Sequence, residues 1–308
     1  MLKIIVLGAA AGGGFPQWNC NCDICRAGRA GNGLAWPATQ SSLAVSADGE
    51  TWFLLNASPD IRQQIGQTPA LHPRSGRRHS PIGGVLLTNA DVDHVAGLLT
   101  LRESHPLSLY GTGRVLGVLA ANSVFNVLNP EFVKRNRIEL DRLTPLLLAD
   151  GRPSGLSVEM FPVPGKVALW LEDEAAGPNF GTVAEDTVGV RVTDGEREFF
   201  YIPGCASCPP ELASRLKGAA LLFFDGTTWI DDEMSATGVG HKTGQRMGHM
   251  CMSGPDGSIA AMAPLGIGRR IFIHINNTNP VHLTASPQRA EAEKAGWEIA
   301  YDGMEVTL

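Results

Sequence analysis

Long apolar runs are absent from the sequence, since no stretch reaches the roughly 18 consecutive apolar residues that a membrane-spanning helix requires. Basic runs are also scarce. The densest, Arg74 to Arg78, is short enough to be a solvated loop, and the 308 residues carry a net charge of −6. We therefore predict neither a membrane span nor a nucleic-acid partner. The opening MLKIIVLGAAAGGG has one lysine and a brief apolar stretch. It predicts a buried strand rather than a signal peptide, and hence a cytoplasmic protein.

Several sequence motifs are missing as well. The N-terminal GAAAGGG does not fit G-x-G-x-x-G, and the sequence has neither a P-loop nor a G-x-S-x-G elbow. A dinucleotide site is therefore not expected. Internal repeats and low-complexity stretches are also lacking, so we predict one domain over residues 1–308.

Short apolar strands alternate with segments of helical periodicity, which predicts an α/β fold. The expected strands are Leu2–Leu7, Ser42–Val45, Thr51–Leu55, Gly84–Leu87, Leu107–Tyr110, Ser157–Pro162, Val188–Val192, Phe199–Ile202, Ala220–Phe224, Arg270–Ile275 and Glu298–Tyr301. The expected helices are Asp60–Ile65, His94–Leu101, Gly113–Ala121, Pro209–Lys217 and Ser286–Gly296.

Cysteine is used sparingly, with six residues, and three of them are clustered as NCNCDIC over residues 19–25. Cys20, Cys22 and Cys25 can converge on one ion, and thiolate ligands favour tetrahedral zinc. The alternative is a set of buried free thiols, but this spacing rarely arises for packing alone. Cys205, Cys208 and Cys251 are expected to be packed or free thiols.

Candidate ligands follow several of the expected strands, where open α/β sheets commonly build their sites. Asp93 and His94 occur in TNADVDHVAGLL, and His274 ends a strand in IFIHINNTNP beside Asn276, Asn277 and Asn279. Each signal is weak alone, because the first pair also suits a helix N-cap with a surface histidine, and a strand-end histidine is often structural. Together they indicate a polar pocket.

Two further segments carry candidate proton-transfer and anion-binding groups. Asp225 follows an apolar strand in LLFFDGTTW. The glycine-rich GVGHKTGQRMGHM, residues 238–250, holds Lys242, Arg246 and His249. The alternative for this second segment is an ordinary surface loop.

These motifs resemble the metallo-β-lactamase superfamily, whose tRNA-processing nuclease and cyclic phosphodiesterase branch also carries a Cys-x-Cys-x-x-Cys zinc cluster. GAAAGGGFPQWNCNCDIC, NASPDIR, LLTLRE, DGTTWIDDEM, MGHM, HINNTNP and YDGMEV are similar to the family of that superfamily that acts in the synthesis of coenzyme pyrroloquinoline quinone (PQQ). The resemblance runs from residue 2 to residue 308. It implies a four-layer αβ/βα sandwich with two mixed β-sheets.

The sequence departs from the hydrolase pattern H-x-H-x-D-H at its first two histidines, which are replaced by Asn89 and Asp91. The resemblance places two more hydrolase ligands near Lys166 and Gly204. These changes remove chiefly the ligands of one of two metals, whereas Asp93, His94 and His274 remain. Two histidines and one carboxylate form the ligand set of non-haem Fe(II) oxygenases. Asp91 is kept as a candidate outer or weak metal ligand.

The resemblance implies a role in making PQQ from a cross-linked Glu–Tyr precursor. From the ligand set we predict hydroxylation of the tyrosine ring with mononuclear Fe²⁺ and O2. Asp93, His94 and His274 would hold the iron. His249 and Asp225 would orient substrate or move protons.

Arg246, Lys242 and Asn276 would contact the precursor, with Arg246 suited to a carboxylate. The expected partners are this dipeptide-like precursor and other proteins of the same synthesis, and a homodimer is plausible. The alternatives are a carrier of PQQ or its precursor toward the periplasm and a metal-dependent hydrolase. By position Asn277 is a candidate fourth zinc ligand, with water or another group as alternatives.

Overall fold

The computed structural model describes residues 1–173, 175 and 181–308, and its framework is a pair of seven-stranded sheets. The first sheet has the order β14-β1-β2-β3-β4-β5-β6. Its strands are β1 Lys3–Gly8, β2 Ser42–Ser46, β3 Trp52–Leu55, β4 Ile82–Leu86, β5 Leu107–Gly111, β6 Val133–Arg137 and β14 Glu305–Thr307. The second sheet has the order β13-β12-β11-β10-β9-β8-β7. Its strands are β7 Thr144–Leu147, β8 Pro153–Pro162, β9 Val188–Thr193, β10 Glu198–Ile202, β11 Leu221–Asp225, β12 Arg269–Ile273 and β13 Trp297–Ile299.

Both sheets are mixed in the same way. In the first, β14, β1, β2 and β3 pair antiparallel, whereas β3, β4, β5 and β6 pair parallel. In the second, β7 to β10 pair antiparallel and β10 to β13 pair parallel. Each sheet therefore has a parallel part, and the residues that follow its strands meet at one edge.

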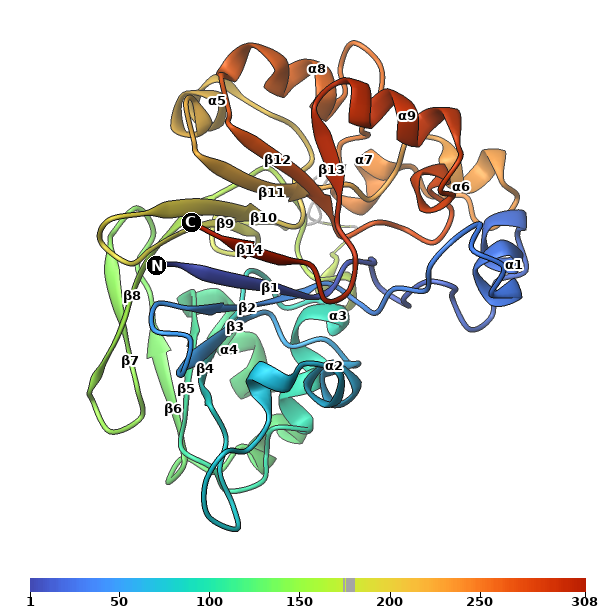
Figure 1. The fold of residues 1–308 in the computed structure, drawn as a ribbon. Coiled ribbons are helices and arrows are strands. Elements are labelled where there is room, and N and C mark those ends of the chain that lie inside the picture. The colour runs from blue at the N-terminus through green and yellow to red at the C-terminus, as the bar shows by residue number, and fades with distance from the viewer. Residues whose placement is uncertain (174, 176–180) are drawn as a thin grey trace.

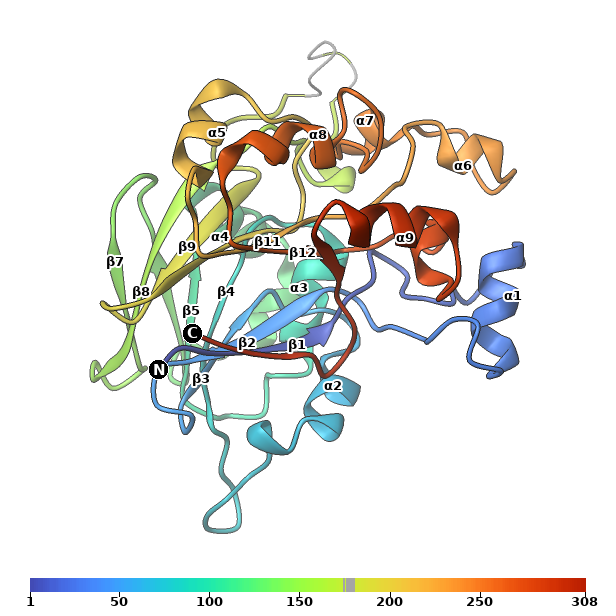
Figure 2. The same ribbon diagram turned by 45° about the horizontal axis from the view of Figure 1, so that its top comes forward.

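Helices cover the outer face of each sheet (Figures 1 and 2). The helices are α1 Asp23–Ala30, α2 Ile61–Gln67, α3 Val92–Val95, α4 Gly113–Ala121, α5 Pro210–Leu216, α6 Glu233–Ala236, α7 Gly244–Met247, α8 Ser258–Met262 and α9 Pro287–Lys294. Residues of α2, α3 and α4 share a buried cluster with the first sheet, and residues of α5, α8 and α9 share one with the second. The expected four-layer metallo-β-lactamase sandwich is therefore confirmed.

The period-two pattern of the strands builds these layers. In β1, Ile4 and Val6 enter the core between the sheets, whereas Ile5 enters the core under the outer helices. In β11, Phe223 faces the central core and Phe224 faces the helices. Successive side chains of a strand point to opposite faces, so a strand that is apolar throughout is buried on both sides.

A backbone connection joins the two sheets beside the ends of their strands. The N–H of Ala11 donates to the carbonyl of Ile275 at 2.8 Å, and the N–H of Ile275 donates to the carbonyl of Ala9 at 2.9 Å. This connection fixes the segment after β12 against the segment after β1.

Most expected elements lie within a few residues of the observed ones, and Gly113–Ala121 is observed as predicted. The helix expected over His94–Leu101 is instead α3 followed by a 3₁₀ turn, Ala96–Leu99. A Cβ on Gly97 would lie 2.1 Å from the carbonyl oxygen of Ser58, so this turn packs directly on backbone. The strands β6, β7 and β14 and the helices α1, α6, α7 and α8 were not predicted. In β6 the sequence VKRNR has no apolar alternation, because it is an edge strand.

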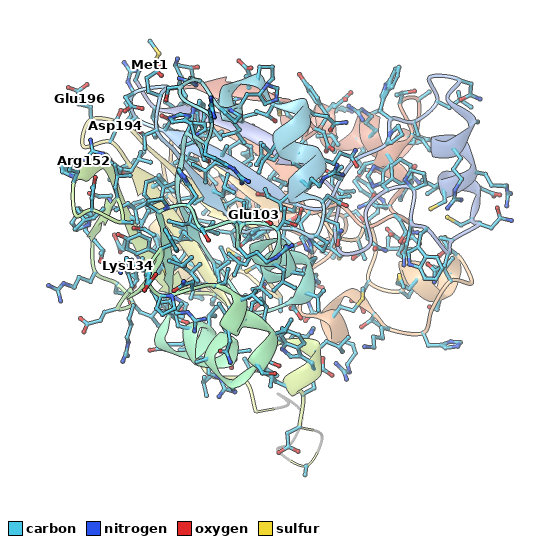
Figure 3. All side chains as sticks on the ribbon, turned by 90° about the horizontal axis from the view of Figure 1, so that it is seen from below. Met1, Glu103, Lys134, Arg152, Asp194 and Glu196 are labelled. Atoms are coloured by element: carbon cyan, nitrogen blue, oxygen red, sulfur yellow. The ribbon has the colours of Figure 1, made fainter. Side chains whose placement is uncertain are left out.

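The two ends of the chain are paired, since the N–H of Leu2 donates to the carbonyl of Leu308 at 3.2 Å. The amino group of Met1 lies 3.3 Å from Asp194, and both residues are labelled in Figure 3. Arg74 to Arg78 are exposed, as expected of a loop. Throughout the described ranges, no helix has the length and apolar character needed to cross a membrane.

Candidate metal and proton-transfer centre

Three of the predicted ligands come from different elements and meet at the edge of the sandwich. Asp93 and His94 lie in α3, after β4, and His274 directly follows β12. One ligand atom from each of these side chains lies within 4.8 Å of the others. Oδ2 of Asp93 is 3.0 Å from Nε2 of His274 and 3.7 Å from Nε2 of His94. The sequence-predicted triplet is thus brought together.

His94 is held in one orientation by Asn89. Nδ1 of His94 lies 2.7 Å from Oδ1 of Asn89, and the same oxygen accepts the N–H of Asp91 at 3.0 Å. Because that oxygen is an acceptor, Nδ1 of His94 carries the proton and Nε2 keeps its lone pair. Nε2 is buried and has no hydrogen-bond partner among the described residues. An orphaned lone pair of this kind is what a metal ligand requires.

His274 is oriented by Thr227. Its Nδ1 lies 2.9 Å from the Thr227 hydroxyl, which also donates to Oδ1 of Asp225 at 2.6 Å. The hydroxyl proton is therefore directed to the carboxylate, and the hydroxyl oxygen accepts from His274. The backbone of His274 has φ of 59°, which is uncommon for a residue other than glycine. This left-handed conformation belongs to the residue whose Nε2 faces Asp93.

The electrostatics of the triplet also suit a cation. Burial lowers the pKa of His94, so that its imidazole is neutral. Burial opposes ionisation of Asp93, yet the two histidines outweigh it and hold the pKa of this carboxyl well below its usual range. Burial likewise opposes the charge on His274, but the hydrogen bond that its Nε2 donates to Asp93 raises the pKa of this imidazole overall. A proton and a metal ion would compete for Nε2 of His274.

A second group adjoins the first. Nδ1 of His249 lies 2.6 Å from Oδ2 of Asp225, and the rings of His249 and His274 are stacked with centroids 5.2 Å apart. Asp225 is fully buried and also accepts the N–H of Cys205 at 2.8 Å. A carboxylate on Nδ1 fixes the tautomer of His249 and leaves Nε2 for proton transfer.

Gly204 leaves room for that ring. A Cβ at Gly204 would lie 3.4 Å from Cε1 of His249. The position at which the resemblance expects a hydrolase aspartate therefore lies against the imidazole of the second group.

The structure does not bring every predicted site residue to the triplet. Asp91 is outside the potential ligand groups, and its Oδ1 accepts the N–H of Leu169 at 3.0 Å. The side chain of Asn276 points instead to Thr278, at 2.6 Å, and to Sδ of Met234. Lys242 is exposed. Arg246 pairs with Glu172 through both terminal nitrogens.

Sequence reasoning missed Asn89 and Thr227 as positioning residues. Asn89 was noticed only as a replaced histidine, although it lies five residues before His94. Thr227 contacts His249, His274 and Asp225, and its signal was its place two residues after Asp225.

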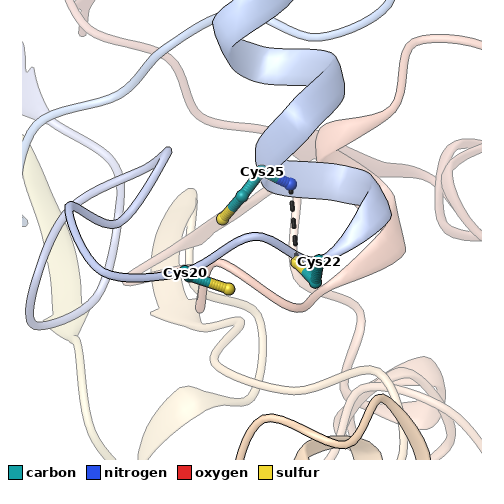
Figure 4. A group of neighbouring side chains, drawn as sticks. All are labelled: Cys20, Cys22 and Cys25. Atoms are coloured by element: carbon teal, nitrogen blue, oxygen red, sulfur yellow. Dashed lines mark hydrogen bonds between the residues drawn. The ribbon is translucent and has the colours of Figure 1, made fainter.

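The three clustered cysteines also converge (Figure 4). Their sulfur atoms lie within 4.8 Å of one another. Sγ of Cys22 accepts the N–H of Cys25 at 3.5 Å and so caps α1. The side-chain amide of Asn277 lies 3.3 Å from Sγ of Cys25, so the predicted fourth position adjoins the thiols. Three convergent thiols fit a zinc ion.

The other three cysteines have ordinary environments. The thiol of Cys205 donates to the carbonyl of Ser207 at 3.0 Å, and that of Cys251 donates to Ser253 at 3.3 Å. Burial raises the pKa of both Cys205 and Cys208. Within the described chain all three are free and lie outside the potential metal-ligand groups, as expected of packed thiols.

The comparisons with known proteins agree with this architecture. The model of the beta-lactamase superfamily domain matches residues 51–275. The sandwich and the ligands at its edge thus define a protein of the metallo-β-lactamase superfamily. A diphosphatase of the PhnP family shares the fold, with a TM-score of 0.67 at 19% identity over 100% of this chain and 98% of that one.

Other relatives are much more similar. Coenzyme PQQ synthesis protein B of Gluconacetobacter diazotrophicus is 54% identical over 100% of both chains, and that of Rhodopseudomonas palustris is 53% identical over the same shares. The crystal structure of Zn(2+)-bound PqqB from Methylobacterium extorquens has a TM-score of 0.94 and 53% identity over 99% of this chain and 100% of that one. The chain belongs to the coenzyme PQQ synthesis protein B family.

Proposed function

We propose that this protein acts in the synthesis of PQQ and hydroxylates the tyrosine ring of a cross-linked Glu–Tyr precursor, using one Fe²⁺ ion and O2. The names of its relatives support the biosynthetic role. The reaction type rests on the ligand triplet and its neighbours.

The single observation that carries the reaction type is the convergence of Asp93 with Nε2 of His94 and Nε2 of His274. Two imidazoles and one carboxylate are the donors of mononuclear Fe(II) oxygenases, which leave coordination positions open for oxygen and substrate. Nε2 of His94 is buried and has no hydrogen-bond partner within the part of the chain that the structure describes, which a bound ion would remedy. The residues present therefore fit the metal.

Bound Fe²⁺ would supply the activation of O2, and the chain would supply binding and proton transfer. Asn89 and Thr227 hold the two imidazoles in the tautomer that presents Nε2. Nε2 of His249 would take the proton of the phenol, because Asp225 holds the other ring nitrogen.

The overall reaction places one oxygen atom of O2 on the ring and releases the other as water. It consumes two protons and two electrons, which an external reductant such as ascorbate would provide in an assay. The cysteine cluster is proposed to hold a structural zinc ion, apart from this chemistry.

The test combines metal quantitation with oxygen consumption on the cross-linked dipeptide and a reductant. Iron-loaded protein should consume oxygen and yield the hydroxylated ring, whereas zinc-loaded protein and His274→Ala should not. Tight binding of PQQ or precursor without turnover would instead indicate a carrier. Absence of oxygen uptake by protein that has bound iron would reject the proposal.

A second candidate is a dinuclear hydrolase, and one observation favours it. Asp225, His249 and His274 form another group whose ligand atoms lie within 4.8 Å. A hydrolase of this type would need two ions about 3.5–4 Å apart. However, both oxygens of Asp225 already accept hydrogen bonds from Thr227 and Cys205. Two metal ions per chain beyond the cysteine-held zinc, with hydrolysis of a phosphodiester, would favour this second function.

A further inference from the structure

A short strap, defined here as residues 167–173, connects the two sides of the candidate centre. These sides are called walls here: one carries α3, and the other carries α7 and His249. Its middle is a 3₁₀ turn, Leu169–Leu171, whose three side chains are all substantially exposed. Three exposed apolar side chains in succession are unusual, because leucine and tryptophan side chains are mostly buried in folded proteins. The contacts at the two ends of the strap show what holds it.

The first end is tied to the wall that carries α3. The N–H of Leu169 donates to Oδ1 of Asp91 at 3.0 Å. Asp91 is the residue directly before α3, and its carbonyl accepts the N–H of His94 at 2.9 Å. The strap therefore begins beside the metal-ligand triplet.

The second end is tied to the wall that carries α7 and His249. Nη2 of Arg246 lies 2.8 Å from Oε2 of Glu172, and Nη1 of Arg246 lies 3.3 Å from Oε1. Nζ of Lys166 lies 3.2 Å from the same Oε1. Both oxygens of one carboxylate are thus held by two cations.

This pair of cations lies next to His249 as well. A Cβ on Gly248, the residue before His249, would be 3.0 Å from Cγ of Lys166. Arg246 is in α7, three residues before His249. Lys166 and Arg246, together called the clamp here, shield the carboxylate of Glu172 from water, since its side chain is 9% exposed. Its partners hold the pKa of Glu172 well below its usual range, with Arg246 as the largest cause.

A planar arginine fork with a neighbouring ammonium is a geometry that binds carboxylates in general. We propose that Lys166 and Arg246 form a carboxylate-binding site of the active centre, and that Glu172 occupies it as an internal substitute for a carboxylate of the substrate. Entry of an aromatic substrate would exchange its own carboxylate for that of Glu172 and release this end of the strap.

The inference rests on the proposed function for its substrate, because a precursor derived from glutamate and tyrosine carries carboxylates beside an aromatic ring. It adds Lys166, which the sequence indicated only as lying near a replaced hydrolase ligand, and gives Glu172 the role of a competitor. It also gives a reason for the contact of both Lys166 and Arg246 with the carboxylate of Glu172, since a substrate carboxylate would meet the same two cations.

The experiment measures binding of PQQ, which carries three carboxylates on an aromatic frame, to the iron-free full chain by titration calorimetry. Glu172→Gln should bind it about tenfold more tightly, because the internal competitor is lost while the side-chain size is kept. Arg246→Met and Lys166→Met should each weaken binding by about tenfold or more. The trimethyl ester of PQQ should not respond to any of these substitutions.

Glu131→Gln, at an exposed position on the surface, is the matched control and should bind as the unsubstituted chain does. Glu172→Asp has a shorter side chain that reaches Lys166 and Arg246 less well, so its affinity for PQQ should lie between those of the unsubstituted chain and Glu172→Gln. It replaces Glu172→Gln if that variant does not fold. Unchanged or weaker binding by Glu172→Gln, or full affinity in Arg246→Met, would overturn the inference. Because these titrations need neither iron nor oxygen, they stand apart from the oxygen-consumption test of the proposed function.

Discussion

Oδ1 of Asn89 lies 2.7 Å from Nδ1 of His94, and this contact decides which nitrogen of the imidazole faces Asp93. Groups that orient a ligating histidine commonly account for a 10–100-fold change in metal affinity. We therefore expect Asn89→Ala to weaken iron binding by about that factor, measured by competition with a chelator of known affinity. Asn126→Ala, at an exposed position, is the control. Equal affinity of a folded Asn89→Ala protein would contradict this role.

Asp225 should matter for turnover more than for metal binding. It accepts from Nδ1 of His249 at 2.6 Å but is not one of the three iron ligands proposed above. Asp225→Asn should lower kcat by about 10²–10⁴-fold while the iron content stays the same. The exposed Asp232→Asn is the control, and metal analysis with steady-state oxygen consumption is the measurement. Loss of iron together with activity would show that Asp225 is a ligand instead.

The buried Cys25 should be needed for zinc. Cys25→Ser should reduce the zinc content by one ion per chain and lower the Tm by about 5 °C, since each kcal/mol lost from a large domain moves Tm by about 2–4 °C. Cys208→Ser, outside the cluster, should keep both values. Elemental analysis and calorimetry check this, and an unchanged zinc content in Cys25→Ser would place the zinc elsewhere.

Glu233 should make stability fall as pH rises. Burial raises its pKa to about 7, although its carboxylate accepts from Thr278 and from the N–H of Trp229, each at 2.6 Å. The folded state therefore binds a proton more tightly than the unfolded state, and stability declines between the unfolded pKa of about 4.5 and the folded value of about 7. The decline attributable to this group is at most about 3 kcal/mol.

Glu233→Gln should flatten that decline, as followed by urea unfolding at a series of pH values. Asp302 has a pKa raised to about 6 by burial and adds a fall in the same direction, so the slope should shrink rather than vanish. The exposed Glu291→Gln should leave the profile unchanged. A Glu233→Gln protein with the full slope would show that another group causes it.

The parts of the site that follow buried strands could be predicted from the sequence. A doubly buried strand such as β11 is apolar throughout, so the polar Asp225 at its end is conspicuous. His274 directly follows the apolar end of β12, and Asp93 lies in the short helix after β4. The residues that follow parallel strands lie at one edge of the sheet, which is why Asp93, Asp225 and His274 are close together in the structure.

The contacts that tune the centre could not be predicted in this way. Glu172 reaches Arg246 across 74 positions of the chain, and Asp91 reaches Leu169 across 78. Neither carboxylate lies in a pattern of apolar residues, because both are positioned by loops. Their partners depend on how segments that are distant in the sequence are placed against each other, which local sequence patterns do not predict.

The backbone connection between Ala9, Ala11 and Ile275 lies one residue beyond His274. Asp93 and His94 belong to the first sheet's side of the molecule and His274 to the second, so an ion held as proposed by these three residues would bridge the two halves that these peptide groups join. A shift of one half of the sandwich relative to the other would change the ligand geometry of that ion before either half unfolded. The optical or magnetic spectrum of a bound ion would then report changes in the relative position of the two halves.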